Sequence, residues 1–169
     1  MADMKIANWP VVTGCERLTP GCDNCPTYWE YKEKGESYHP KINFRDIMTP
    51  GDTEEPTAFM VAAGSDLFHE SVTAHFIDTV FAVMKENPQH HFEVGTKRIE
   101  RAVALSNRGL KWPDNVVAFT AVEESKYKWR IEALREIDAK TKMVSFGPMV
   151  GRVGSINMTG IDVAGVVVE

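Results

Sequence analysis

Residues 57–64 read TAFMVAAG, with Pro56 before them and Ser65-Asp66 after them. Nearly every position in this run is apolar. A strand with one face in water would alternate apolar and polar residues, so the run predicts a strand that is buried on both faces, as in a parallel sheet. The glycine and the polar residues that follow predict that the strand ends near residue 64.

Further segments toward the C-terminus repeat this pattern. The predicted strands are HFEVGT (91–96), NVVAFTAVE (115–123), TKMVSFGP (141–148) and DVAGVVVE (162–169), with PKINFRDI (40–47) as a weaker candidate. Helices are predicted between them, over 26–35, 71–88, 97–109 and 126–137. In the 71–88 segment, apolar residues recur at helical spacing until Asn87-Pro88 ends the pattern. In the last helix, Trp129, Leu134 and Ile137 are predicted to be buried.

Alternating strands and helices predict right-handed crossovers and an α/β layer fold. About six mostly parallel strands are too few for a complete eight-stranded barrel. We therefore expect a partial (β/α) barrel or an open curved sheet, in a single domain over residues 1–169. Either architecture gathers functional residues at the carboxyl ends of the strands. The residues at these ends are Gly64-Ser65-Asp66, Thr96-Lys97-Arg98, Val122-Glu123-Glu124, Phe146-Gly147-Pro148 and Glu169.

The composition narrows the class of protein. The chain has 169 residues and a formal net charge of −5, which argues against a non-specific nucleic-acid binder. No apolar stretch approaches the roughly 18 residues of a membrane span, and the first residues do not resemble a secretory signal. We therefore expect a cytoplasmic protein without a membrane partner. In that reducing setting, clustered cysteines indicate metal binding or catalysis rather than disulfides.

All three cysteines lie in GCERLTPGCDNC (14–25), where Cys15, Cys22 and Cys25 have the spacing C-x6-C-x2-C. The glycines and the proline around them let the backbone curl so that three thiolates can face one centre. The residues alone leave three explanations open. They are free thiols of no special role, a structural zinc with a histidine or carboxylate as fourth ligand, and an iron–sulfur cube with one iron left open for a small molecule.

Four ordered blocks carry a resemblance to a known family. They are Asn8-Trp9-Pro10 leading to Thr13-Gly14-Cys15, Thr19-Pro20-Gly21-Cys22 with Cys25, SDLFHE at 65–70, and TKRIER at 96–101. In these blocks the chain resembles a set of phage and prophage proteins within the radical S-adenosylmethionine superfamily. Superfamily members bind a 4Fe–4S cluster through three cysteines in a partial barrel, and S-adenosylmethionine chelates the open iron. The chain departs from the family at Pro26-Thr27, at SFGPM (145–149) and at VVE (167–169).

The resemblance implies that Cys15, Cys22 and Cys25 bind the cluster, with residues 1–35 as cluster-binding loop and first helix and residues 40–169 as β/α core. Several polar residues are predicted at strand ends. Some of them suit contacts with S-adenosylmethionine, and others suit a phosphate or carboxylate of the substrate. The predicted cofactor contacts are Ser65, Asp66, Glu123 and Glu169, and the predicted substrate contacts are Lys97 and Arg98. The structural alternatives are a helix N-cap for Ser65 and Asp66 and solvated carboxylates for the two glutamates.

The implied reaction is one-electron cleavage of S-adenosylmethionine to methionine and a 5′-deoxyadenosyl radical, which abstracts a hydrogen from the substrate. Some phage proteins resembling this one modify DNA bases, for instance by rearranging an amino-acid-decorated thymine, so DNA or a modified nucleotide is the expected substrate and the host cytoplasm its setting. Such a base would have to leave the duplex. Trp9, Trp29 and Trp112 are candidates for stacking on it, although at least two of them are expected in the core.

Other roles remain open. His69 is a candidate for donating a proton or a hydrogen bond, with packing or capping as the alternative. For the whole chain, the alternative functions are a zinc-stabilised, non-enzymatic interaction domain and a phosphate-binding partial barrel whose cysteines have no role.

Overall fold

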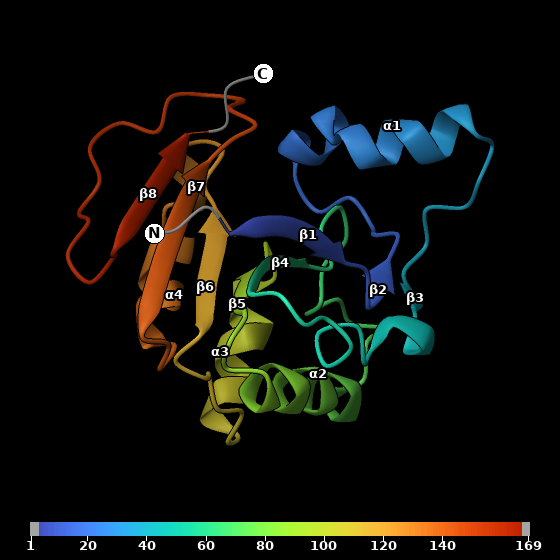
Figure 1. The fold of residues 1–169 in the computed structure, drawn as a ribbon. Coiled ribbons are helices and arrows are strands. Elements are labelled where there is room, and N and C mark those ends of the chain that lie inside the picture. Colours follow the sequence, from blue (N-terminus) through green and yellow to red (C-terminus); the bar gives the residue numbers. More distant parts are fainter. Residues whose placement is uncertain (1–3, 167–169) are drawn as a thin grey trace.

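The computed structural model describes residues 4–166 as a curved parallel sheet with helices against it (Figure 1). The sheet has six strands in the order β1-β4-β5-β6-β7-β8, and every neighbouring pair is parallel. The strands are β1 (Lys5–Trp9), β4 (Thr57–Val61), β5 (His91–Gly95), β6 (Val116–Ala121), β7 (Thr141–Phe146) and β8 (Val163–Val166). The sheet does not close on itself. The expected α/β fold with about six parallel strands is confirmed, and the open sheet is compatible with a partial barrel.

The first strand of this sheet was not predicted, and the weaker strand candidate at 40–47 is wrong as a member of it. Within 40–47 only β3 (Lys41–Ile42) is extended, and it pairs antiparallel with β2 (Val12–Thr13) in a separate two-stranded sheet. A short 3-10 helix, η2 (Phe44–Asp46), follows at once. The strand β1 lies at an edge of the main sheet and only Trp9 of its residues is buried. An edge strand with so little buried surface has no continuous apolar run to reveal it.

Three helices connect the parallel strands. They are α2 (Ala74–Glu86), α3 (Ile99–Asn107) and α4 (Trp129–Glu136). The helix α2 begins after Thr73, whose hydroxyl accepts a hydrogen bond from the backbone N–H of Phe76, an N-cap that satisfies a free donor of the first turn. The apolar residues at helical spacing in the predicted segment 71–88 are buried: Val72, just before the helix, and Phe76, Val80, Phe81, Val83 and Met84 within it.

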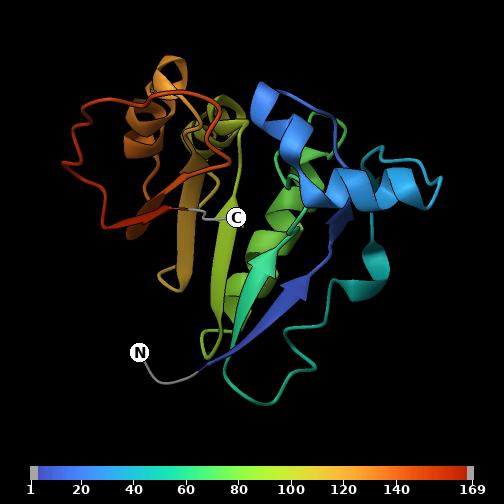
Figure 2. The same ribbon diagram turned by 90° about the horizontal axis from the view of Figure 1, so that it is seen from above.

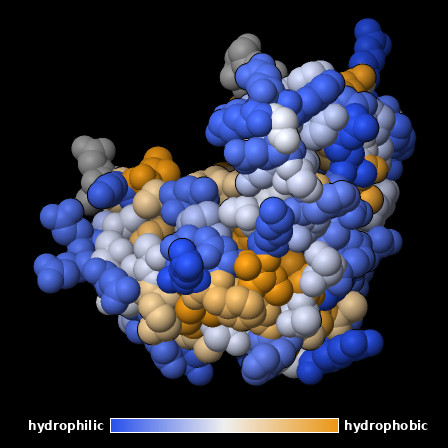
Figure 3. All heavy atoms as spheres, turned by 90° about the vertical axis from the view of Figure 1, so that its right-hand side faces the viewer, coloured by the Kyte–Doolittle hydropathy of each residue, from blue (hydrophilic) through white to orange (hydrophobic). Residues whose placement is uncertain are grey.

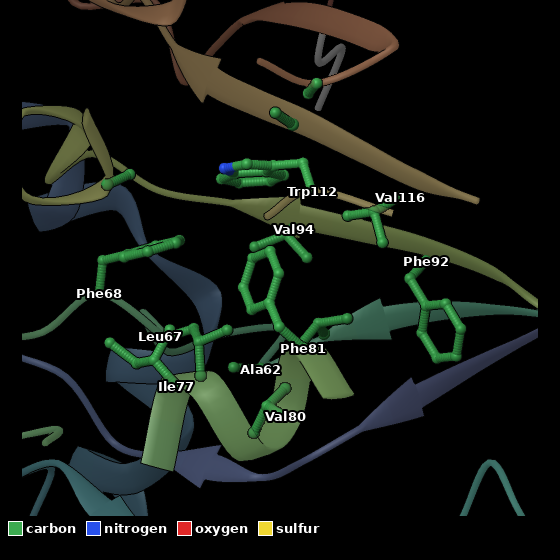
Figure 4. Close-up of a cluster of buried hydrophobic side chains, with 14 of the residues drawn as sticks. Ala62, Leu67, Phe68, Ile77, Val80, Phe81, Phe92, Val94, Trp112 and Val116 are labelled. Carbon is green, nitrogen blue, oxygen red and sulfur yellow. The ribbon is translucent and has the colours of Figure 1, made fainter. Parts of the chain in front are cut away.

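The core lies between α2 and the sheet (Figure 4). Phe81 of α2 meets the Trp112 ring edge-on at 4.9 Å, and Phe68 stacks on the same ring at 6.0 Å. Trp112 and Trp9 are both buried, so the expectation that at least two of the three tryptophans belong to the core is confirmed. The third, Trp29, is exposed.

The helix α4 differs from prediction at one position. Leu134 and Ile137 are buried as expected, but Trp129 is 41% exposed. Arg130, the next residue, points inward instead and is 1% exposed. Its guanidinium donates a 2.9 Å hydrogen bond to the carbonyl of Ala121 at the end of β6. A buried arginine has no place in a pattern of apolar residues. The periodicity of the segment therefore could not predict that Arg130 points inward.

The helix α1 (Pro26–Glu33) stands apart from the other helices and has no buried residue. Figure 2 shows that the arrowheads of β1 and β4 point toward it, so α1 lies near the carboxyl ends of these strands. On the face seen in Figure 3 it forms a largely hydrophilic projection above an apolar area. The segment after β3 contributes two exposed apolar side chains, Phe44 and Met48. Among residues 4–166, no helix has both the length and the apolar character to cross a membrane.

Candidate functional site

A cavity of about 380 Å³ lies at the carboxyl ends of the parallel strands. Its volume falls within the range of roughly 300–1,000 Å³ typical of small-molecule sites. We call it the strand-end cavity; its lining includes Cys15, Cys22 and Cys25, residues 60–66 at the end of β4, Glu93 and residues 95–98 of β5 and its loop, and Phe119 and Ala121 of β6. All three cysteines, which the chain places before the second strand of the sheet, therefore face the edge where the strand ends meet.

The cysteine loop is held against these strand ends by its backbone. Gly14 has a φ of +72°, a conformation that favours glycine, and a side chain there would collide with the carbonyl of His39. The Gly14 carbonyl accepts a hydrogen bond from the Ser65 hydroxyl, and the Cys15 N–H donates to the backbone carbonyl of Tyr38 at 2.8 Å. Cys22 follows in the 3-10 helix η1 (Pro20–Asn24). The loop thus keeps its shape through contacts with β4 and with the segment around Tyr38.

Cys22 lies beside a cation. The Lys97 ammonium is 3.5 Å from its sulfur, and the Thr19 hydroxyl is equally far on the N-terminal side. Burial opposes ionisation of this thiol, but the hydrogen bonds from Thr19 and the backbone together with the Lys97 charge lower its pKa below the usual value. Thiolates are the form that binds metals. The surroundings of Cys22 therefore favour the thiolate, the form that acts as a ligand.

Cys15 has the opposite electrostatics. Burial and the nearby Asp66 carboxylate raise its pKa to about 11, although Arg98 acts against them. The Arg98 guanidinium lies 3.8 Å from the Cys15 sulfur and also pairs with Asp66 at 3.3 Å and with Glu70 at 2.9 Å. Two carboxylates pair with this guanidinium and offset its positive charge. Arg98 therefore lowers the pKa of Cys15 only weakly.

Cys25 faces a phenol. The Tyr38 hydroxyl lies 3.7 Å from the Cys25 sulfur and donates a 2.7 Å hydrogen bond to the carbonyl of Gly64. Burial and the adjacent Cys25 raise the pKa of Tyr38, so the phenol stays protonated at neutral pH. Each of the three sulfurs therefore has its own polar neighbour: Arg98 beside Cys15, Lys97 beside Cys22 and the Tyr38 hydroxyl beside Cys25.

Of the predicted cofactor contacts, Asp66 is occupied by internal hydrogen bonds. Its carboxylate accepts from the Thr96 hydroxyl at 2.7 Å, from the Phe68 N–H at 2.9 Å and from Arg98. Burial raises the pKa of Asp66, while these donors oppose the rise. Ser65 and Asp66 both line the strand-end cavity, but their polar atoms hold the ends of β4 and β5 and the cysteine loop together.

Glu123 is fully buried beneath the cysteine loop. It accepts a 2.7 Å hydrogen bond from Thr19 and a hydrogen bond from Lys97, and its second oxygen lies 3.5 Å from Arg130. A side chain at Gly21 would collide with this carboxylate, so the loop packs directly on it. The solvated-carboxylate alternative does not describe Glu123. The fourth predicted contact, Glu169, lies outside the described residues.

The two predicted substrate contacts, Lys97 and Arg98, turn toward the cysteines rather than outward. The reason is the turn after β5: Thr96 accepts a hydrogen bond from the Arg98 N–H at 2.8 Å and donates to Asp66, which sends the next two side chains into the interior. Only 22% of the Lys97 side chain and 7% of the Arg98 side chain is exposed. Both residues line the strand-end cavity.

His69 is buried beside the cysteine loop. Its Nδ1 accepts a 3.1 Å hydrogen bond from the Ser71 N–H, which leaves the proton of the neutral ring on Nε2. That Nε2 lies 3.7 Å from the carboxylates of Glu16 and Glu70 and has no hydrogen-bond partner among the described residues. Burial, reinforced by the Arg98 charge, lowers the pKa of His69. His69 therefore packs as a neutral ring, and it does not line the strand-end cavity.

Sequence reasoning missed three residues of this site. Thr19 and Tyr38 reach Cys22 and Cys25, and Glu93 lines the cavity from the middle of β5. No ion pair of the Glu93 carboxylate is found within residues 4–166, and the residue faces the cavity. Glu93 could have been recognised from the sequence, because it is an acidic residue within a mostly apolar predicted strand. Tyr38 carried no signal, since it belongs to a loop whose path depends on tertiary contacts.

The three cysteines are a donor set that could hold an iron–sulfur cluster. Three unpaired cysteines line one cavity, and thiolates are the ligands of such clusters. Among the described residues, no three His, Cys, Asp or Glu side chains converge as one metal ion requires. The cysteines of a cube bind separate irons, so they need to face a common cavity rather than meet at a point.

These features define an α/β protein with an open parallel sheet and a three-cysteine site at its strand ends. The chain belongs to the family described as "Protein of unknown function (DUF5131)", whose model matches residues 4–168. No curated protein and no solved structure matches the chain.

Proposed function

We propose that this protein is a radical S-adenosylmethionine enzyme that binds a 4Fe–4S cluster through Cys15, Cys22 and Cys25 and acts on a nucleic-acid base or nucleotide. The observation that carries the proposal is that all three cysteines line one cavity at the carboxyl ends of the strands. When bound and reduced by an external one-electron donor, the cluster supplies the electron that cleaves S-adenosylmethionine to methionine and a 5′-deoxyadenosyl radical. The protein's own task is positioning and exclusion of side reactions.

The residues of the chain divide this task. Ser65 and Tyr38 hold the loop that carries the cysteines, through the carbonyls of Gly14 and Gly64. The lining from Met60 to Gly64 supplies an apolar wall and backbone groups. Such walls exclude water, and fixed backbone groups can orient a ligand. The cysteine loop and this wall therefore line the same small-molecule site.

Glu93 takes the polar contact first assigned to Ser65, Asp66 and Glu123. Ser65 and Asp66 have their polar atoms engaged within the protein and Glu123 does not line the cavity, whereas Glu93 lines it and has no ion-pair partner among residues 4–166. A carboxylate in such a position suits an ammonium group or ribose hydroxyls, both of which S-adenosylmethionine carries. We assign Glu93 this role.

The nucleic-acid substrate is supported by the family resemblance and by aromatic groups on α1, whose first residue, Pro26, lines the cavity. Tyr28 lies under the guanidinium of Arg17, whose carbon is 5.0 Å from the ring centroid, and Trp29 lies under the ammonium of Lys32 at 4.2 Å. Bases stack on exposed aromatic rings, and cations beside the rings attract phosphates. Since Lys97 and Arg98 point inward, this rim on α1 and the cysteine loop replaces them as the proposed substrate contact.

The decisive experiment is anaerobic purification followed by reconstitution with iron and sulfide. We expect a brown protein with about four irons and four sulfides per chain, and cleavage of S-adenosylmethionine when dithionite is added. The variant in which all three cysteines are replaced by alanine should bind no cluster and cleave nothing. A colourless protein that carries zinc and loses its fold in this variant would instead support the zinc-stabilised interaction domain. Unchanged fold and no metal in either protein would leave the cysteines without a role.

A further inference from the structure

Two consecutive residues after β5 reach two different cysteines, and their charges are not equally available. Arg98 shares its guanidinium between Asp66 and Glu70, so little net charge remains for Cys15. Lys97 has a single carboxylate partner, Glu123. The ammonium of Lys97 therefore lies between two groups, the sulfur of Cys22 at 3.5 Å and the buried Glu123.

Glu123 is itself shared by two cations. Its first oxygen accepts from Lys97 and Thr19, and its second lies 3.5 Å from Arg130. Both Glu123 and Arg130 are almost completely buried, so water screens their charges weakly. Lys97, Arg130 and Glu123 together carry one net positive charge, and Lys97 brings its ammonium to 3.5 Å from the Cys22 sulfur.

We propose that Lys97 is a positioning residue that sets the reduction potential of the cluster through Cys22, and that Glu123 limits its effect. This inference rests on the proposed function. Reduction adds one negative charge to the cluster, and the potential of a protein-bound cluster depends on nearby charge and on hydrogen bonds to its sulfurs. A cation at the ligand sulfur stabilises the reduced state, whereas a buried carboxylate behind that cation destabilises it.

These charges predict that two substitutions shift the reduction potential of the cluster in opposite directions. Lys97→Met keeps an unbranched side chain, one atom shorter, and removes the positive charge, so the potential should fall. Glu123→Gln keeps the shape and an oxygen that can accept from Thr19, and it removes the negative charge, so the potential should rise. A purely structural role for both residues would loosen the loop in each variant and would move the two potentials in the same direction.

The test is a dye-mediated redox titration of the reconstituted protein, followed by electron paramagnetic resonance of the reduced cluster. At a fixed solution potential, we expect the ratio of reduced to oxidised cluster to fall about tenfold in Lys97→Met, which corresponds to about 59 mV for a one-electron couple, and to rise in Glu123→Gln. The matched control is Lys140→Met. Lys140 is also ion-paired, with Asp114 at 3.1 Å, but it lies before β7 at the opposite end of the strands, so its removal should leave the potential unchanged.

The outcomes separate the two proposals. A wild-type protein that binds no iron and sulfide overturns the proposed function and this inference with it. A wild-type protein that binds the cluster while both variants keep its potential, or shift it in one direction, overturns only the role of Lys97 and Glu123. If Lys97→Met retains no cluster, Glu123→Gln decides alone: a raised potential supports the inference, and an unchanged or lower one refutes it.

Discussion

In the metal-free protein at pH 8, Cys22 should exchange with a small neutral disulfide at least about ten times faster than Cys15. The two thiols lie on one loop and are both partly buried, but they have different neighbours. Lys97 and Thr19 lower the pKa of Cys22, whereas burial and Asp66 raise the pKa of Cys15 to about 11. The difference in rate therefore reports directly on the charges around the cysteine loop.

The expected magnitude follows from two opposing effects. At pH 8 a thiol with a pKa of 11 is about 0.1% thiolate, and one with a pKa below 9 is more than about 9% thiolate, which is a difference of about a hundredfold. A more basic thiolate is also a better nucleophile, with a Brønsted coefficient of about 0.4–0.5, and this recovers about tenfold over two pKa units. About tenfold remains in favour of Cys22.

The assay is timed reaction with 2-hydroxyethyl disulfide, acid quenching and mass spectrometry of the modified peptides, in a Cys25→Ser background so that Cys25 cannot displace the label from Cys22. The exposure of a thiol affects its rate equally at every pH, whereas its pKa sets how the rate changes with pH. The pH profile therefore separates the two effects on the rate. The rate at Cys15 should keep rising through pH 10, while the rate at Cys22 should begin to level off at a lower pH than the rate at Cys15. Equal rates that level off at the same pH would refute the electrostatic account, and the urea-unfolded protein should show little difference between the two thiols.

Three further predictions concern the core, the cavity and the pH dependence of stability. Phe81→Ala should lower the free energy of unfolding by about 3–5 kcal/mol in urea titrations, because it opens a cavity against Trp112; the exposed Phe44→Ala should cost well under half of that, and equal losses would contradict the placement of the core. Glu93→Gln should weaken binding of S-adenosylmethionine to the cluster-loaded protein by about tenfold or more, as expected for loss of a charged hydrogen bond, and an unchanged dissociation constant in calorimetry would exclude the contact. Because burial lowers the pKa of His69 in the folded state, the unfolded chain binds a proton first as the pH falls, so this residue should cost stability as the pH drops below about 6.5. His69→Gln should flatten that part of the stability profile, and a slope equal to that of the wild type would show that His69 does not contribute to it.

The sequence by itself determined the class of fold and most of its elements. Strands buried on both faces must be apolar along their whole length, and the runs at 57–64 and 115–123 overlap β4 and β6. The periodicity of 71–88 predicted both the helix α2 and its buried face, because one side of a helix repeats about every 3.6 residues. The clustering of the three cysteines was likewise visible, since it is a property of the chain and not of its folding.

Only the tertiary structure decided where the edge strand lies and which way the charged side chains point. The strand β1 buries little, so its pattern resembles that of a loop until its pairing with β4 is known. Two adjacent basic residues such as Lys97 and Arg98 are usually exposed to solvent. Here the turn at Thr96 and the carboxylates of Asp66 and Glu123 direct them to the cysteines. Patterns of hydrophobicity report burial along one element, whereas the orientation of a buried charge depends on partners that the fold brings from distant parts of the chain.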